Sequence, residues 1–186
     1  NFSTTGCTGS RPGLAGKGLN SSGGVKLFLG GGGGAGHANS TVQTYGGGNG
    51  GGIIFLIAKN IIGNGNKISA NGQNGKSTSY DGASGGGAGG TIIMNVTGSY
   101  SGALTIQANG GNGGSEDDDN SLNRCYGAGG GGSGGVLFFN SSLPGVTTFY
   151  AGGIAGINTD INGCGTPVPA ANGTNGSAIS GYSYQS

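Results

Sequence analysis

The chain has 186 residues, and 51 of them are glycine, several times the usual share of about 7%. Its 4 prolines do not recur every third residue, which excludes collagen, and no basic stripe accompanies its net charge of +1, so we expect no nucleic-acid partner. Only 7% of residues are charged, unlike a disordered chain, and no apolar run approaches the roughly 20 residues of a membrane-spanning helix.

The predicted elements begin with a strand, VKLFL (25–29), which follows Gly-Gly and is interpreted as a degenerate first unit. Three copies of one pattern come next, each a glycine run, an apolar strand, a turn and a second strand. The first strands are IIFLIA (53–58), TIIMNV (91–96) and VLFFN (136–140). The turns are rich in Asn, Gly and Ser, as tight turns require. The second strands are KISA (67–70), ALTIQA (103–108) and VTTFYA (146–151).

The two strands of a unit differ in their apolar pattern. The second strands alternate, with Ile68 and Ala70 opposed to Lys67 and Ser69, which predicts a sheet with one solvent-facing side. The first strands are apolar nearly throughout, which predicts burial on both faces. We expect the neighbouring glycine run to cover the second of those faces. An Asn-Gly or Gly-Gly pair follows each second strand and is interpreted as a corner of the unit.

The glycine runs at 30–34, 46–52, 85–90 and 127–135 are expected to be ordered, extended and close to one another, because isolated polyglycine would lose too much entropy. The fold class predicted is all-β, either a repeat-built β-solenoid or a layered β-sandwich with ordered extended polyglycine segments and almost no helix. The organisation expected is a lead-in (1–24), the repeats (25–156) and a polar cap or tail (157–186), within one continuous domain.

Three variable loops follow the same position of their units, at 76–84, 115–126 and 157–164. Stacked units would bring these loops to one edge, where binding residues are often carried. Residues suited to polar ligands such as glycans are Tyr80, Asp81, Arg124, Tyr126 and Asp160. The alternative is that these loops vary because nothing constrains them.

An acidic cluster lies within the second loop and consists of Glu116, Asp117, Asp118, Asp119 and Asn120. These oxygen ligands suit Ca²⁺, although the calcium-binding nonapeptide would need Asp where this chain has Ser115. The alternative is a solvated loop. No other cofactor is expected.

The single histidine and the three cysteines give little support for catalysis. His37 is either a general base or a loop side chain that bonds to glycine-run backbone, and we expect no enzyme activity. Cys7, Cys125 and Cys164 form no Cys-x-x-Cys pair, so zinc is not expected. A Cys125–Cys164 disulfide is expected from stacking of their loops, with Cys7 as the rival partner and buried thiols as the alternative.

Four stretches resemble glycine-rich modules of large secreted Bacteroidota proteins that end in gliding-motility or type IX secretion sorting domains. They are LGGGGGAGHANSTV (29–42), GGNGGGIIFLIAKNIIGNGNKISANG (47–72), GGGAGGTIIMNVTGSYSGALTIQANGGNGG (85–114) and RCYGAGGGGSGGVLFF (124–139). A weaker resemblance is to phage tail-fibre tip adhesins with layered polyglycine. The resemblance implies secretion, surface attachment and repetitive architecture.

The resulting functional expectation is an extracellular or cell-surface structural module of a fibre, filament or adhesin stalk. Its partners would be further copies of itself or neighbouring modules of a larger surface protein. The alternative is an adhesin module that binds glycans or a host surface through the three variable loops.

Overall fold

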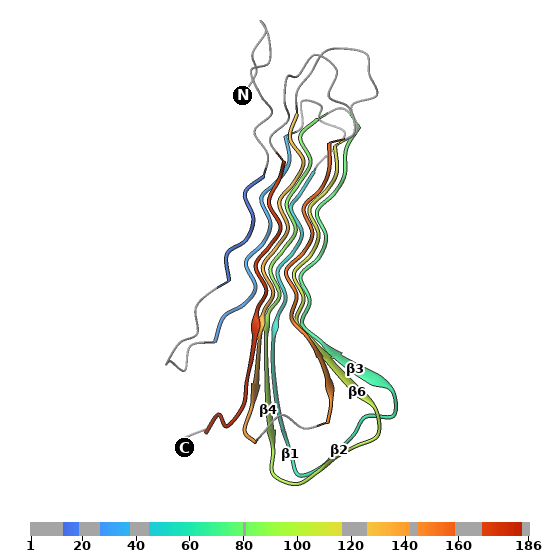
Figure 1. The fold of residues 1–186 in the computed structure, drawn as a ribbon, viewed down its shortest axis with the longest axis vertical. Helices are drawn as coiled ribbons and strands as arrows, with labels where there is room; N and C mark the ends of the chain where they lie inside the picture. Colours follow the sequence, from blue (N-terminus) through green and yellow to red (C-terminus); the bar gives the residue numbers. More distant parts are fainter. Residues whose placement is uncertain are drawn as a thin grey trace, which may run out of the picture.

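The computed structural model describes residues 13–18, 27–37, 45–79, 81–116, 126–141, 145–158 and 169–183. These residues form β-strands and extended segments without a helix, in agreement with the all-β prediction. Accordingly, the described part of the chain holds no helix long and apolar enough to cross a membrane. Figure 1 shows an elongated shape, with the strands at one end and wavy extended segments along the remainder.

The strands form three parallel sheets, in which equivalent strands of successive units lie side by side. The first sheet contains β1 (Ile53–Ala58), β4 (Thr91–Val96), β7 (Val136–Phe139) and β9 (Ser177–Ile179). The second contains β3 (Asn66–Ser69), β6 (Leu104–Gln107) and β8 (Thr147–Phe149). The third is a short pair of β2 (Ile61–Ile62) and β5 (Tyr100–Ser101). The repeat seen in the sequence is therefore a structural repeat.

Several predicted elements differ from the structure in detail. The predicted strands at 53–58 and 91–96 coincide with β1 and β4, whereas the stretch 27–29 of the predicted first strand is extended but is not a strand. The predicted turns contain β2 and β5, and β9 was not predicted. The turn between β2 and β3 has left-handed backbone at both central residues, with φ of 49° at Asn64 and 77° at Gly65, and asparagine and glycine adopt this conformation most readily.

The hydrophobic core lies where the first and second sheets face each other. Ile92, Met94, Leu137 and Phe139 come from the first sheet, and Leu104 and Ile106 come from the second. The predicted alternation is confirmed in β6, where Leu104 and Ile106 are buried and the alternate residues, Thr105 and Gln107, are half-buried. Burial of each such side chain contributes roughly 1.5–3 kcal/mol.

The expectation that first strands are buried on both faces holds for β4 and is wrong for β1. Ile53, Phe55 and Ile57 of β1 are 39%, 44% and 66% exposed. Across the same face of the sheet, Phe138 of β7 is buried and its ring lies 5.2 Å from that of Tyr182, which follows β9. Tyr182 thus covers the sheet near β7 and β9, at the edge opposite β1. The outer face of β1 remains partly exposed.

The glycine runs continue the strands lengthwise and do not cover their faces, so the expected covering role is wrong (Figure 1). The register of the sheet continues into them: the amides of Gly48 and Gly51 donate to the carbonyls of Gly85 and Ala88 at 2.9 and 2.8 Å. Donors recur every third residue, which is the period of an extended helix with three residues per turn. The prediction that these runs are extended and adjacent is confirmed.

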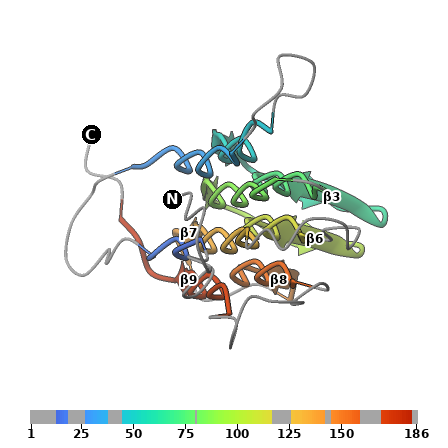
Figure 2. The same ribbon diagram turned by 90° about the horizontal axis from the view of Figure 1, so that it is seen from above.

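Because consecutive residues face different directions, one segment can bond to several neighbours. In segment 126–135, the amide of Gly131 donates to Ala171, that of Gly132 donates to Gly111, and the carbonyl of Gly130 accepts from Gly86. Figure 2 shows the segments nearly end-on, as coils lying beside one another. Glycine allows this close approach, since a side chain on these faces would meet a neighbouring backbone.

The extended segments form three rows, as their hydrogen bonds define them. The central row precedes the first sheet and contains segments 45–52, 81–90, 126–135 and 169–176. The asparagine row follows the second sheet and contains segments 70–78, 108–116 and 150–158. The outer row, on the opposite side of the central row, contains segments 27–37 and 13–18.

The asparagine row corrects the interpretation of Asn-Gly pairs as corners, because the chain remains extended there. The side-chain oxygens of Asn71 and Asn74 accept the backbone amides of Asn109 and Asn112 in the next segment, at 2.7 and 2.8 Å. Asn112 in turn accepts the amide of Ile154 at 2.8 Å. On this exposed face the asparagines supply the acceptors for the adjacent segment.

Candidate functional site

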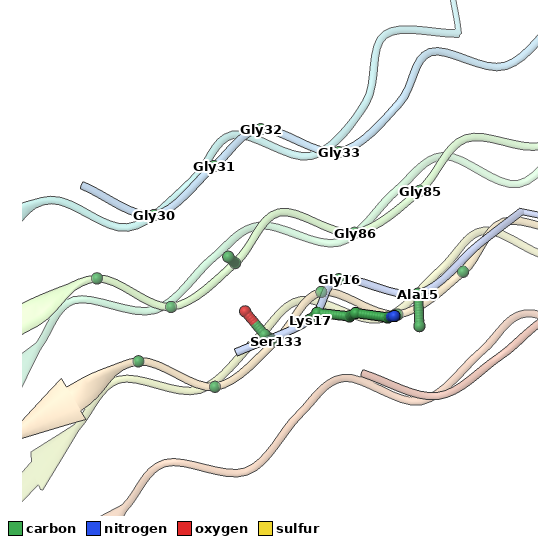
Figure 3. Close-up of a pocket in the computed structure, with 18 of the residues that line it drawn as sticks. Ala15, Gly16, Lys17, Gly30, Gly31, Gly32, Gly33, Gly85, Gly86 and Ser133 are labelled. Atoms are coloured by element: carbon green, nitrogen blue, oxygen red, sulfur yellow. The ribbon is translucent and has the colours of Figure 1, made fainter. Parts of the chain in front are cut away.

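A groove of about 390 Å³ opens between the two segments of the outer row (Figure 3). Its walls are residues 14–17 and 28–34, and its floor is formed by segments 81–90 and 126–135 of the central row. Lys17 and Ser133 supply polar side chains in the labelled view, while most of the surface is glycine backbone. Whatever this groove binds would therefore meet main-chain groups.

Four backbone groups on the floor of the groove are unusual. Gly86, Gly89, Gly130 and Ser133 are buried. Within the described ranges, no hydrogen bond reaches the carbonyl oxygens of Gly86 and Gly89 or the amides of Gly130 and Ser133. Buried main-chain donors and acceptors are nearly always paired, so a row of unpaired groups requires an explanation.

A second feature is the loop end, which we define as the end of the extended segments farthest from the sheets (Figure 1). Parallel bridges join Thr78 to Glu116 and Glu116 to Asn158, one residue from each unit. The described beginnings of the three variable loops therefore lie side by side, as expected from stacking. Asn158 also donates from its side-chain amide to the carbonyl of Tyr126 at 2.9 Å.

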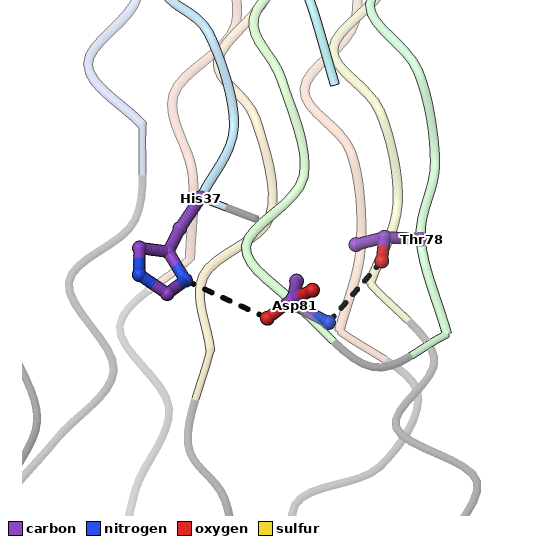
Figure 4. Close-up of polar contacts among 3 residues, drawn as sticks. All are labelled: His37, Thr78 and Asp81. Carbon is purple, nitrogen blue, oxygen red and sulfur yellow. Dashed lines mark hydrogen bonds and ion pairs between the residues drawn. The ribbon is translucent and has the colours of Figure 1, made fainter. Parts of the chain in front are cut away.

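His37 and Asp81 meet at the loop end (Figure 4). His37 Nδ1 lies 3.5 Å from Asp81 Oδ1, and the imidazole is 46% exposed whereas the carboxylate is 5% exposed. The Asp81 amide donates to Thr78 Oγ1 at 3.2 Å, which fixes the backbone beside the carboxylate. The His37 ring also stacks on Tyr126, with ring centroids 6.4 Å apart. His37 Nδ1 and Asp81 form an ion pair when the imidazole is protonated.

This geometry brings together two of the five predicted ligand-binding residues, Asp81 and Tyr126, both against His37. The backbone amide of His37 donates to the carbonyl of Gly82 at 3.1 Å, while its side chain lies against Asp81 and Tyr126. The other predicted ligand-binding residues lie outside the described residues: Tyr80, Arg124 and Asp160.

The acidic cluster is described only at its first residue. Glu116 is 1% exposed, so the interpretation of this position as part of a solvated loop is wrong; its bridges to Thr78 and Asn158 place it inside the array. The rest of the cluster and all three cysteines lie outside the described residues: Asp117, Asp118, Asp119, Asn120, Cys7, Cys125 and Cys164. The described residues contain no group of three or more His, Cys, Asp or Glu placed to hold a metal ion.

Sequence reasoning missed both the groove and the asparagine ladder. The available signal was a period of three: Asn71, Asn74 and Ser77 recur at three-residue spacing, as do Asn109, Asn112 and Ser115. The groove has no such signal, because it depends on which distant segments become neighbours. No protein-family model, curated protein or solved structure matches the chain.

Proposed function

We propose that this chain is a structural module of an extracellular fibre, filament or adhesin stalk, built as a β-solenoid that extends by adding units. The observation that carries the proposal is the stack of equivalent units in parallel register, from β1 through β4 and β7 to β9. Such a stack has no intrinsic end, because each unit offers its neighbour the same edge.

The two ends of the first sheet support association with further units. β1 pairs with β4 and β9 pairs with β7, so β1 and β9 are the two outermost of the described strands in this sheet. Exposed strand edges are templates for another chain, and joining unlike ends gives head-to-tail growth. The exposed Ile57 of β1 and Ile62 of β2 add apolar surface to the same end. We infer that the partner is a second copy or a neighbouring module of a larger protein.

Secretion is part of this proposal and rests on composition and on the resemblance to secreted Bacteroidota modules. Low charge and abundant Gly, Asn and Ser suit tight lateral packing outside the cell. No catalytic role is proposed, and calcium at the acidic cluster stays a secondary proposal.

Assembly can be tested by adding a charge to the β1 end. Ile57→Lys places an ammonium group at the exposed strand, where charge opposes edge-to-edge pairing. Light scattering and negative-stain microscopy of the parent should show concentration-dependent, linear assemblies, and this variant should stay monomeric. Gln107→Lys is the matched control, since it adds the same charge to β6 within the stack. A parent that stays monomeric at high concentration would contradict the proposal.

An adhesin that binds glycans is the alternative function, and the loop end favours it. An aromatic ring stacked beside a carboxylate, as Tyr126 and Asp81 are placed around His37, offers a platform and a polar acceptor for a sugar. A glycan array probed with the parent and with Tyr126→Ala separates this function from the structural one. Binding that Tyr126→Ala abolishes would support it, and no binding by the parent would remove it.

A further inference from the structure

The hydrogen bonds of segment 27–37 define what an outer-row position requires. This segment lies between two central segments, 45–52 and 81–90. The amides of Gly30 and Gly33 donate to the carbonyls of Gly51 and Gly48, both at 2.8 Å. The carbonyls of Gly31 and Gly34 accept from the amides of Ala88 and Gly85, both at 2.9 Å. An outer-row position is therefore flanked by one central segment that offers carbonyl acceptors and by another that offers amide donors. On each central segment these groups recur every three residues.

Segment 13–18 meets the same requirement between segments 126–135 and 169–176. The amides of Gly13 and Gly16 donate to the carbonyls of Ala128 and Gly131. The carbonyls of the same two glycines accept from the amides of Ala171 and Thr174 at 3.5 and 3.4 Å. Two separate parts of the chain therefore use one pattern of bonds.

The groove is the position between these two, where segments 81–90 and 126–135 face outward. The sheet register, Ile53 to Thr91 and Thr91 to Val136, carries along the row. By that register the acceptors should be the carbonyls of Gly86 and Gly89, and the donors should be the amides of Gly130 and Ser133. These are the four buried groups that have no hydrogen bond among the described residues.

We propose that the groove is a binding site for an extended, glycine-rich segment of a separate polypeptide, which would complete the outer row. The segment would donate to Gly86 and Gly89 and accept from Gly130 and Ser133. Its direction is free, since segment 27–37 runs antiparallel to its central neighbours and segment 13–18 runs parallel. This inference concerns the groove alone and does not depend on the assembly proposed above.

The two seated segments also define the sequence of the occupant. A Cβ at Gly30 or Gly33 would overlap the carbonyl oxygen of Ala88 or Gly85, and a Cβ at Gly13 would overlap the amide of Gly130. By contrast, a Cβ at Gly31 or Gly34 would meet nothing within 4 Å. In the seated segments, one residue in three must therefore be glycine, and the same position in the groove calls for an occupant with the repeat Gly-x-x-Gly.

The test is a titration with a synthetic Gly-Ser-Asn repeat peptide of about twelve residues, four turns at three residues per turn. An Ala-Ser-Asn peptide of the same length is the control. Residue-resolved amide exchange on the dilute chain should show that Gly130 and Ser133 exchange fast alone and slow by about tenfold or more when the glycine peptide binds. The amide of Gly132, already bonded to Gly111, should change little. The alanine peptide should have no effect.

A variant that fills the groove provides the second arm. A Cβ at Gly85 would lie between Gly34 and Gly130, and Ala88, one turn further on, lines the groove on the same face. Ala88→Leu should abolish peptide binding, whereas Ala151→Leu, at an exposed alanine of the asparagine row, should preserve it.

Three results would overturn the proposal. In the first, the glycine peptide leaves the exchange of Gly130 and Ser133 unchanged. In the second, these amides are already slow in the dilute free chain, which would assign the groove to another part of the same chain. In the third, they become slow when the free chain alone is concentrated, which would assign the groove to a second copy.

Discussion

At the residue scale, some glycines of the extended segments leave no room for a side chain, whereas others face open space. A Cβ at Gly132 would overlap the carbonyl oxygen of Gly87, while a Cβ at Gly52 would meet nothing within 4 Å. Gly132→Ala should therefore lower the free energy of unfolding by about 1–3 kcal/mol, the usual cost of overpacking. Gly52→Ala should raise it by about 0.4–1 kcal/mol, since alanine restricts the unfolded chain. Urea unfolding measures both, and equal effects would contradict the close packing described here.

Tyr100 should make the free energy of unfolding fall as the pH rises into the alkaline range. Its hydroxyl is buried without a hydrogen-bond partner, and burial raises the pKa of Tyr100 above its usual value of about 10. The neutral form is thus favoured by folding, so its contribution is fully present below the unfolded pKa and is lost as pH rises through the folded pKa. Tyr100→Phe should leave stability at pH ~7 unchanged or higher and should reduce its decline above pH ~10. Thermal unfolding of both proteins across this range measures the difference, and parallel curves would count against it.

At the element scale, asparagine side chains accept main-chain amides on a face where the described ranges place no further segment. Asn112→Ala removes the acceptor of the Ile154 amide, and water replaces it because Asn112 is exposed. The expected loss is about 0.5–1.5 kcal/mol of unfolding free energy. Asn112→Asp retains an acceptor oxygen and should lose less. Chemical denaturation of the parent and both variants measures these losses. If Asn112→Ala unfolds at the same denaturant concentration as the parent, the ladder does not contribute to stability.

The sequence predicted elements well where side chains encode them. β1 and β4 were predicted with their observed bounds, because dense apolar residues follow Gly-Gly at each start. β9 was missed because Ser-Ala-Ile gives almost no apolar pattern, and its pairing with β7 comes from tertiary contact. The Asn-Gly pairs that follow the second strands were assigned to corners because that dipeptide usually marks turns. Among the described residues, a turn of this kind is seen at Asn64 and Gly65, before β3, whereas the chain stays extended at the pairs that follow β3 and β6.

At the scale of the whole molecule, backbone bonds and apolar burial should make stability insensitive to salt. The chain has 7 basic and 6 acidic residues among 186, so screening acts on few charges. Raising ionic strength from about 0.1 to 1 M, which shortens the Debye length from about 10 to 3 Å, should change Tm by no more than the error of calorimetry. A drop in Tm would mean that ion pairs such as His37 with Asp81 contribute more than the array does.

The arrangement of segments could not be predicted from the sequence. Glycine carries no side chain to mark a partner, so nothing in LGGGGG at 29–34 states that Gly30 will bond Gly51 and that Gly31 will bond Ala88. Adjacency of the runs was predictable from the entropy of glycine, but the rows and the groove were not. At the loop end, stacking predicted that the loops would meet, whereas the contact of His37 with Asp81 required the outer row to be in place.

The three-residue period gives insertions and deletions in the glycine segments an all-or-none character. Removing one residue turns everything beyond it by about 120° around the segment axis, since three residues complete a turn. In segment 108–116, such a deletion before Asn109 would swing the ladder residues inward and carry glycines to the surface. Removing three residues only shortens the segment by one turn. Only insertions or deletions of three residues, or a multiple of three, keep each residue facing its original direction. The glycine runs should therefore tolerate changes in length only by whole turns.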